Sequence, residues 1–214
     1  MQIKHHIQVV VVLYRCNITQ SKSLISLLNA KREINDLFDF DILVYNNYTP
    51  SPITPNPQFE IYNATSNEML AGAYNYALNQ ANKKNIDWLL LLDQDSCLTT
   101  KYFKELYHAI SNAQKDDCVA CIVPRIFNGN HQLSPVKYNP ILGPKWFLSG
   151  IKPGTSNKCH FAFNSATLIK TKAINKIGQF PNEYPLDDLD ICYFYRLFKL
   201  GYKSIILNSK IEHQ

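Results

Sequence analysis

The sequence predicts a single α/β domain, residues 1–214, with a mainly parallel central sheet flanked by helices. Three observations lead to this prediction. Apolar segments of strand length alternate along the chain with longer amphipathic segments, as they do in βαβ units. The run Trp88-Leu89-Leu90-Leu91-Leu92 is apolar at every position, which is typical of a strand buried on both faces. With 214 residues, of which 46% are hydrophobic and 18% charged, the chain can bury one substantial core.

Strands and helices alternate through the first half of the chain. The expected strands cover residues 8–14, 41–45, 59–62 and 88–92. The expected helices cover about 19–31, 68–84 and 100–115. Ser66 or Asn67 is expected to cap the second helix and Thr99 the third, because their side chains can accept from free N–H groups of the first turn. Four prolines mark a loop before the third strand: Pro50, Pro52, Pro55 and Pro57.

The second half of the chain is expected to continue this pattern after a long loop. A strand is expected at 118–123, followed by an irregular segment at 124–158 that is long enough to have a functional role. Another strand is expected near Phe161, then a short helix at 171–177. The last helix is expected at 189–200, ending at Gly201, and the last strand at 203–207.

The charge and the apolar pattern narrow the class of partner and the compartment. The net charge is +5, and the basic residues are scattered rather than clustered. This suits anionic small substrates or an anionic membrane surface, and we expect no nucleic-acid partner. No apolar stretch has the length of a membrane span, and Val9–Leu13 is too short for a signal-peptide core. We therefore expect a cytoplasmic protein, with peripheral contact at the inner face of the cell membrane left open.

Six cysteines fit reduced thiols in a cytosolic protein. Cys118 and Cys121 have the spacing of zinc ligands, and Cys159-His160 could supply a second pair. However, residues three apart in a strand point to opposite faces, so the expected strand disfavours a zinc site there.

Two carboxylates, Asp93 and Asp95, directly follow the Leu-rich strand. In open α/β sheets, ligands bind beyond the carboxyl ends of the strands. Magnesium takes oxygen ligands, often one or two carboxylates together with substrate phosphates. The pattern therefore indicates a metal site for a phosphate-bearing substrate. A solvated turn is the alternative, and this stretch alone does not decide between them.

The glycine-rich nucleotide loops are missing. The first strand is followed by Tyr14-Arg15-Cys16-Asn17 rather than Gly-x-Gly-x-x-Gly, and no phosphate-binding P-loop sequence occurs. With only seven glycines in the chain, a phosphate is better held by a metal ion than by a glycine loop. This favours the metal-site interpretation of the Asp-x-Asp pair.

A second acidic cluster precedes the last helix. Asp187, Asp188 and Asp190 lie within four residues, and mutual repulsion can raise the pKa of one of them. Such a carboxylate could act as a general base. Taken alone, the pattern favours helix capping, with Asp188 as the N-cap.

Together these motifs resemble glycosyltransferase family 2, in order and over nearly the whole chain. The similar segments are Val9–Tyr14, Val44–Asn47, Asn67–Asn75, Leu91–Ser96, Asn164–Ala166, Ile177–Phe180 and Leu186–Asp190. The Leu91–Ser96 segment is particularly similar to the metal loop of the bacterial rhamnosyltransferase branch. Asn46 stands where the family usually has aspartate, and Met69 where it has glycine. His213 resembles the family's late histidine near the metal or diphosphate, with a solvated residue at a frayed terminus as the alternative.

The resemblance implies a GT-A-type fold and an inverting, metal-dependent sugar transfer. The implied metal is Mg²⁺ or Mn²⁺, held by Asp93, Asp95 and His213. The implied general base is Asp188 or Asp187, while a branch-type Asp-x-x-Asp pattern would select Asp187 with Asp190. The residues implied for nucleotide-sugar binding are Leu13, Tyr14, Arg15, Asn46, Asn67, Gly72, Asn75, Asp93 and Gln94. Asn164 and Ser165 resemble the acceptor-side loop, and the C-terminal lid or membrane-associating helix of many relatives is not expected in this sequence.

The donor is not specified by the residues. The rhamnosyltransferase likeness favours dTDP-rhamnose, with UDP-sugars close behind, and implies a glycan or lipid-linked acceptor in cell-surface polysaccharide synthesis. Two other classes stay open. One is a metal-dependent nucleotidyltransferase, for which a basic glycine-rich triphosphate loop is missing. The other is a non-catalytic or degenerate nucleotide-sugar binding module, which Asn46 and Met69 would suit.

Overall fold

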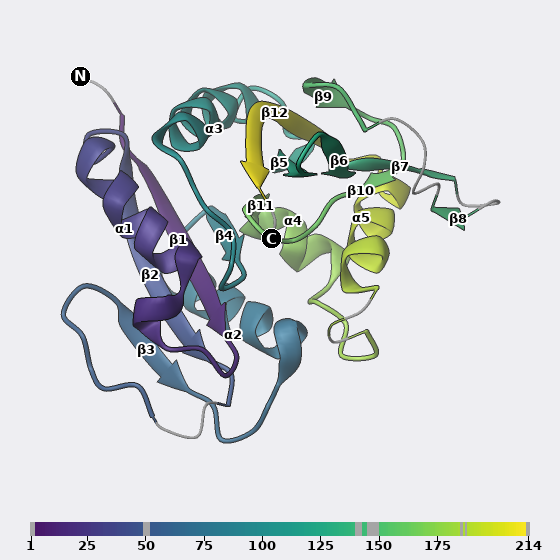
Figure 1. Ribbon diagram of the computed structural model, residues 1–214. Coiled ribbons are helices and arrows are strands. Elements are labelled where there is room, and N and C mark those ends of the chain that lie inside the picture. Colours follow the sequence, from purple (N-terminus) through teal and green to yellow (C-terminus); the bar gives the residue numbers. More distant parts are fainter. Residues whose placement is uncertain are drawn as a thin grey trace.

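The computed structural model describes residues 3–48, 52–139, 143–144, 150–184, 186 and 188–212. Within these residues a nine-stranded sheet is flanked by helices and accompanied by a three-stranded sheet (Figure 1), which confirms the α/β prediction. The helices are η1 (Ile18–Gln20), α1 (Lys22–Glu33), α2 (Met69–Lys83), α3 (Thr100–Ala113), α4 (Thr171–Ile177) and α5 (Leu189–Lys199). The strands are β1 (His5–Leu13), β2 (Phe38–Asn46), β3 (Glu60–Asn63), β4 (Trp88–Leu92), β5 (Val119–Asn128), β6 (His131–Ser134), β7 (Val136–Asn139), β8 (Gly143–Pro144), β9 (Gly154–Ser156), β10 (His160–Phe161), β11 (Thr167–Lys170) and β12 (Lys203–Glu212).

The strand order of the large sheet is β3-β2-β1-β4-β11-β5-β12-β9, with β6 paired to β5. Strands β3, β2, β1 and β4 are mutually parallel, and β5 and β12 are parallel to each other. Strand β11 is antiparallel to both β4 and β5, so all the longer strands run in one direction. Their carboxyl ends therefore meet at one edge of the sheet, where a ligand is expected.

Each face of the sheet carries its own apolar core. On one face Leu90 and Leu92 of β4 join the side chains of α1 and α3. On the other face Leu89 and Leu91 join those of α2 and α5. All four leucines have no exposed surface, so the unbroken apolar run reflects burial on both faces.

Several boundaries differ from the sequence expectations. Helix α1 begins at Lys22 rather than near 19, because Ser21 is its N-cap and accepts a hydrogen bond from the Leu24 N–H. The N-cap position of α2 is Glu68, whose side chain makes no capping hydrogen bond, whereas Asn67 accepts from the N–H of Met69, the first residue of the helix, at 3.0 Å. Thr99 does cap α3, as predicted, accepting from the Tyr102 N–H at 3.2 Å.

The segment 124–158 is not the irregular loop that its composition predicted. Its described part contains the second half of β5 and the strands β6, β7, β8 and β9. The turn Asn128-Gly129-Asn130 joins β5 to β6, with Gly129 at a φ of 58°. Strand β11 was not predicted, and β12 extends five residues beyond the expected end at Leu207, to Glu212. A strand of four residues or fewer spans too few alternations to carry a periodic signal, which explains why β11 and the short strands of this segment were missed.

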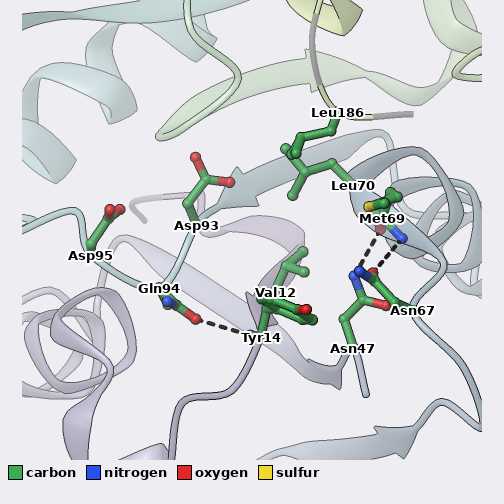
Figure 2. Close-up of a pocket in the computed structure, with 10 residues that line it drawn as sticks. All are labelled: Val12, Tyr14, Asn47, Asn67, Met69, Leu70, Asp93, Gln94, Asp95 and Leu186. Atoms are coloured by element: carbon green, nitrogen blue, oxygen red, sulfur yellow. Dashed lines mark hydrogen bonds between the residues drawn. The ribbon is translucent and has the colours of Figure 1, made fainter. Parts of the chain in front are cut away.

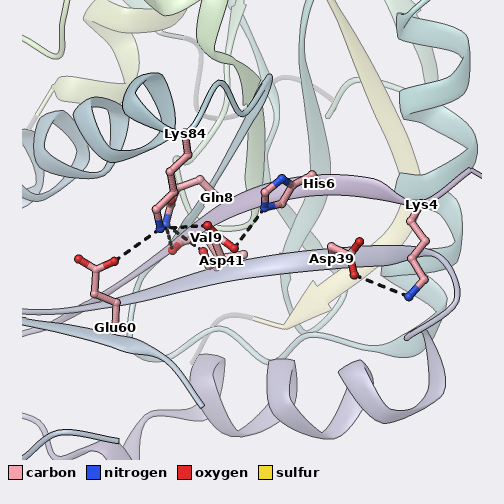
Figure 3. Close-up of polar contacts among 8 residues, drawn as sticks. All are labelled: Lys4, His6, Gln8, Val9, Asp39, Asp41, Glu60 and Lys84. Atoms are coloured by element: carbon pink, nitrogen blue, oxygen red, sulfur yellow. Dashed lines mark hydrogen bonds and ion pairs between the residues drawn. The ribbon is translucent and has the colours of Figure 1, made fainter. Parts of the chain in front are cut away.

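A polar network closes the amino-terminal side of the sheet (Figure 3). The Asp41 carboxylate lies 2.9 Å from the Lys84 ammonium and 3.1 Å from the His6 ring nitrogen. Lys84 also lies 3.6 Å from Glu60, so it links the end of α2 to both β2 and β3. Burial raises the pKa of Asp41, but the hydrogen bonds from Lys84 and His6 outweigh it and leave the pKa below its usual value.

Two further observations bear on the sequence expectations. Cys118 is exposed, whereas Cys121 is buried with its thiol 3.1 Å from the Ser204 hydroxyl. Cys118 lies in the turn before β5 rather than in the strand, so the expected alternation does not apply to this pair. None of the helices that the structure describes is both long enough and apolar enough to cross a membrane.

Candidate functional site

A pocket of about 440 Å³ lies at the carboxyl edge of the parallel strands (Figure 2). Its lining comes from the ends of β1 and β4, the loop after β2, the start of α2 and the segment before α5. The lining residues are Val12, Tyr14, Asn47, Asn67, Met69, Leu70, Asp93, Gln94, Asp95 and Leu186.

Hydrogen bonds between neighbouring loops fix one wall of this pocket. The Gln94 side chain accepts from the Tyr14 N–H at 2.9 Å and so joins the ends of β1 and β4. Asn47 accepts from the Glu68 N–H at 2.8 Å and donates to the Met69 carbonyl at 3.2 Å. Both functional groups of the Asn47 amide are thus used to hold the first turn of α2 against the end of β2.

The two carboxylates after β4 lie in this pocket and differ in their surroundings. Asp93 accepts a hydrogen bond from the Tyr74 hydroxyl at 3.0 Å. The Oδ1 atom of Asp95 is buried and has no hydrogen-bond partner in the part of the chain that the structure describes. A buried carboxylate oxygen without a donor is costly, so Asp95 is suited to a cation or to a donating ligand.

The loop after β4, which carries Asp93 and Asp95, is held in place from two directions. The Ser96 hydroxyl lies 2.5 Å from the Ser165 hydroxyl, and the Ser96 carbonyl accepts from Ser23 at 2.9 Å. Ser21 donates to the Gln94 carbonyl at 3.2 Å. Ser165, expected on the acceptor side, therefore supports the loop that carries Asp93 and Asp95.

The second acidic segment approaches the same place. Asp190 is partly buried, and its pKa is raised to about 8, first by burial and then by the charge of Asp93, while an Asn164 backbone hydrogen bond opposes the shift. The pKa of the buried Tyr74 hydroxyl is also well above its usual value, because of burial and the charges of Asp93 and Asp190. Asp93, Asp190 and Tyr74 thus form one electrostatically coupled group.

Asp188 has a different setting from Asp190. It is exposed and adopts a left-handed backbone conformation at a φ of 61°. It occupies the N-cap position of α5, but its side chain makes no capping hydrogen bond. The capping interpretation, which the sequence alone favoured, therefore lacks its hydrogen bond. Non-glycine residues in this conformation are uncommon and tend to occur at functional sites.

Asn164 lies beside Asp190 and is only 2% exposed. Neither its Nδ2 nor its Oδ1 atom has a hydrogen-bond partner within the described residues. An unpaired buried amide next to a carboxylate pair can bind a hydroxyl of a substrate, as donor and as acceptor.

The remaining expected residues are placed as follows. Of the residues expected to bind the nucleotide sugar, Tyr14, Asn67, Asp93 and Gln94 line the pocket. The others do not line it: Leu13, Arg15, Asn46, Gly72 and Asn75. Asp187 and His213 lie outside the described residues.

The structure gives other contacts to three of the residues that do not line the pocket. The Asn46 side chain donates to Asn63 at 2.7 Å, joining β2 to β3. Asn75 exchanges two hydrogen bonds of 2.9 Å with the Phe180 backbone. Gly72 packs against Glu68, whose carboxylate accepts from the Tyr45 hydroxyl.

The residues of the pocket that sequence reasoning missed include Asn47, Met69 and Leu70. Asn47 directly follows β2, whereas Asn46 is its last residue, so the side chain that enters the pocket depends on where the strand ends. Met69 has a φ of 57°, a conformation that suits the glycine expected at this position.

The donor set suits a hard divalent cation, with oxygen ligands from Asp93 and Asp95 and one of these oxygens lacking a partner. Among the described residues no cluster of three or more His, Cys, Asp or Glu side chains could hold a metal ion. A metal here would thus take most of its ligands from the substrate or water, as Mg²⁺ commonly does.

Comparisons with known proteins bear on the fold and on the family. Two structures of S. aureus TarS 1-349, one in complex with UDP-GlcNAc, match 99% of this chain at 14% identity with a TM-score of 0.60. At this identity the likeness shows the fold, and the chain spans 60% and 58% of the two TarS chains. No curated protein is significantly similar in sequence. The family model described as Glycosyl transferase family 2 matches residues 9–178, which include Asp93 and Asp95 but not the second acidic segment, and the chain therefore belongs to this family.

Proposed function

We propose that this protein transfers a sugar from a nucleotide-sugar donor to a hydroxyl of a saccharide acceptor, with inversion at the anomeric carbon. One observation carries the proposal: two acidic loops far apart in the sequence converge at the carboxyl edge of the sheet. The convergence is reflected in the raised pKa of Asp190. Burial is the largest cause of this shift, and the charge of Asp93 is the second.

The donor fits the pocket by its nucleotide and its diphosphate. Tyr14 is 39% exposed at the pocket, and its ring offers an aromatic surface to a pyrimidine base. Asp93 and Asp95 would hold Mg²⁺ or Mn²⁺ beside the diphosphate. When bound, such an ion supplies Lewis-acid stabilisation of the departing diphosphate. Tyr74 orients Asp93 by the hydrogen bond between its hydroxyl and the carboxylate.

Asp188 is the proposed general base. Its exposed carboxylate has no capping hydrogen bond to give up, so it is available to accept the proton of an acceptor hydroxyl. Asp190 keeps its own proton near neutral pH, since its pKa lies at about 8, and Asn164 offers an unpaired amide to a substrate hydroxyl. Asp187 remains the alternative base, and His213 a further proposed metal ligand.

The finer assignments follow the likeness to relatives. We propose dTDP-rhamnose or a UDP-sugar as donor, and a glycan or lipid-linked saccharide in cell-surface polysaccharide synthesis as acceptor. The UDP-GlcNAc complex of S. aureus TarS supports a nucleotide-sugar donor. We further propose a cytoplasmic location, with peripheral contact at the inner face of the membrane.

The decisive experiment measures nucleotide binding and its dependence on metal. UDP, dTDP and their sugars are titrated calorimetrically with Mn²⁺ and then with chelator, against the wild type, Asp95→Ala and the matched control Asp117→Ala, which changes an exposed carboxylate elsewhere. We expect metal-dependent binding in the wild type and control, and a loss of about 10–100-fold or more in Asp95→Ala. Equal affinity of wild type and Asp95→Ala would contradict the metal assignment. Binding without hydrolysis or transfer of any nucleotide sugar would favour a non-catalytic module.

A further inference from the structure

A second pocket, of about 390 Å³, lies where β5, β12 and the start of α3 meet. It shares no lining residue with the candidate functional site. Its lining residues are Thr99, Lys101, Arg125, Asn208, Ser209 and Lys210. Three of the six are cations and none is an acid, so the pocket has a strong positive charge.

Two of these cations face each other across the sheet. Lys210 of β12 is the register partner of Arg125 of β5. Both lie over the ring of Phe127, Lys210 at 4.6 Å and Arg125 at 5.6 Å from the ring centroid. Like charges opposite each other on paired strands are destabilising unless an opposite charge lies between them. In the part of the chain that the structure describes, neither they nor Lys101 form a salt bridge.

The hydrogen bonds around the pocket leave donors free. One guanidinium nitrogen of Arg125, Nη2, donates to the Asn208 carbonyl at 2.6 Å and to the Asn208 side chain at 2.8 Å. These bonds hold the guanidinium in place, yet its Nε atom is buried and has no partner among the described residues. Ser209 is 1% exposed, and its hydroxyl likewise has no partner there.

One carboxylate, that of Glu105, contacts a backbone group of the pocket lining. The Glu105 carboxylate accepts from the Ser209 backbone N–H at 2.7 Å. Thr99 is the N-cap of α3, so the positive end of a helix dipole faces the same region. Cations, unpaired buried donors and a helix N-terminus are together the donor set of an oxyanion site.

We propose that this pocket binds a phosphate group carried by the acceptor, which rests on the transferase function proposed above. Thr99 is four positions after Asp95 in the sequence, so their Cα atoms are at most about 15 Å apart. A phosphate held by Arg125, Lys210 and Ser209 therefore lies within reach of the Asp93–Asp95 loop for a saccharide of a few sugar units. The bound phosphate also relieves the repulsion between Arg125 and Lys210.

The first test uses inorganic phosphate as the probe, with chelator present so that the metal loop cannot contribute. We expect calorimetric titration to show binding to the wild type, a loss of about tenfold in Arg125→Gln and in Lys210→Gln, and no binding to the double variant. The matched control is Arg32→Gln, which removes an exposed cation of α1. Equal phosphate affinity in the wild type and the double variant would overturn the proposal.

Thermal unfolding separates a binding role from a structural role. We expect phosphate to raise the Tm of the wild type and of Arg32→Gln, but not that of the double variant. Ser209→Ala, which removes only the unpaired hydroxyl, should lose part of the rise. If the double variant has a lower Tm without phosphate and the same rise with it, the two cations are structural and the site is absent.

A second arm identifies the source of the phosphate and keeps the test independent of the donor site. Glucose 6-phosphate should bind more tightly than inorganic phosphate, whereas equal affinities would limit the occupant to the free ion and overturn the acceptor assignment. Phosphate binding should survive in Asp95→Ala, and UDP–Mn²⁺ binding should survive in Arg125→Gln. If the wild type does not bind UDP with Mn²⁺ at all, the proposed function is contradicted, whereas the proposed phosphate site is not affected.

Discussion

Replacing Asp190 by asparagine should make the protein more stable than the wild type, and the difference should grow as the pH rises. Asp190 has its pKa raised from 3.8 to about 8, by burial first and by Asp93 second. At pH 7 the folded wild type holds a proton on this carboxyl that the unfolded chain has released. The free energy of unfolding therefore falls as the pH rises from the unfolded pKa to the folded pKa. Asparagine does not titrate, so the variant lacks this loss.

The size of the effect follows from the shift. One pKa unit corresponds to about 1.4 kcal/mol, so a rise from 3.8 to about 8 corresponds to a loss of up to about 5 kcal/mol between pH 4 and pH 8. Asp190 is only partly buried, so we expect a smaller value, with the variant more stable by several kcal/mol at pH 8 and nearly equal at pH 4. Asp93→Asn should recover part of this difference, because it removes the second cause of the shift.

The assay is urea unfolding of the metal-free protein between pH 4 and pH 8.5, followed by fluorescence. Asp188→Asn is the matched control, since it removes an exposed carboxylate of the same segment. The measured quantity is the difference in unfolding free energy between variant and wild type at each pH, which cancels the titration of other groups. A constant difference across this range would refute the coupling of Asp190 to burial and to Asp93.

Three further predictions concern the base, the polar network and the start of α2. Asp188→Asn should reduce transfer about 10²–10⁴-fold with nucleotide affinity and stability unchanged, whereas full transfer would remove Asp188 as the base. Lys84→Met should lower the free energy of unfolding by about 0.5–1 kcal/mol, measured with urea, because it removes the contact with Asp41. A double-mutant cycle with Asp41→Asn measures the coupling energy of the pair. This coupling should disappear as the pH falls below about 4, because Asp41, whose pKa is lowered in the folded protein, then becomes protonated. Gly72→Ala would place its Cβ 2.6 Å from the Glu68 Cβ, so it should lower stability by about 1–3 kcal/mol while UDP affinity, measured by calorimetry, stays within twofold of wild type.

The parts of the fold that were predictable are those where one physical cause acts on many adjacent residues. Burial on both faces makes β4 apolar throughout, and Thr99 marks the start of α3 by its side-chain hydrogen bond. Strand β11 is different, because only four residues separate the Asn164 region from α4 and their pattern fits a loop equally well. Its existence depends on pairing with β4 and β5, which are distant in the sequence, and local pattern does not contain that information.

Some residues of the candidate site could likewise be predicted from the sequence, and others could not. The Asp-x-Asp pair could be predicted because it directly follows a recognisable strand, and a carboxylate there reaches the sheet edge whatever the rest of the chain does. The sequence could not show whether Asn46 or Asn47 enters the pocket. If β2 ended one residue earlier or later, the other amide side chain would point into it. The sequence also does not show that Asn75 is used by the Phe180 backbone, which is 105 residues away.

The three aspartates before α5 show why spacing alone left their roles open. Asp188 and Asp190 are separated by one residue, yet Asp188 is exposed in a left-handed turn, while Asp190 is close enough to Tyr74 and Asp93 for their charges to affect one another's pKa values. The turn at Asp188 therefore sends two identical side chains into opposite environments. A base must release and accept a proton near the acceptor, which favours the exposed carboxylate. A protonated carboxyl adds no charge repulsion to the nearby Asp93, and burial together with the charge of Asp93 favours this protonated state of Asp190.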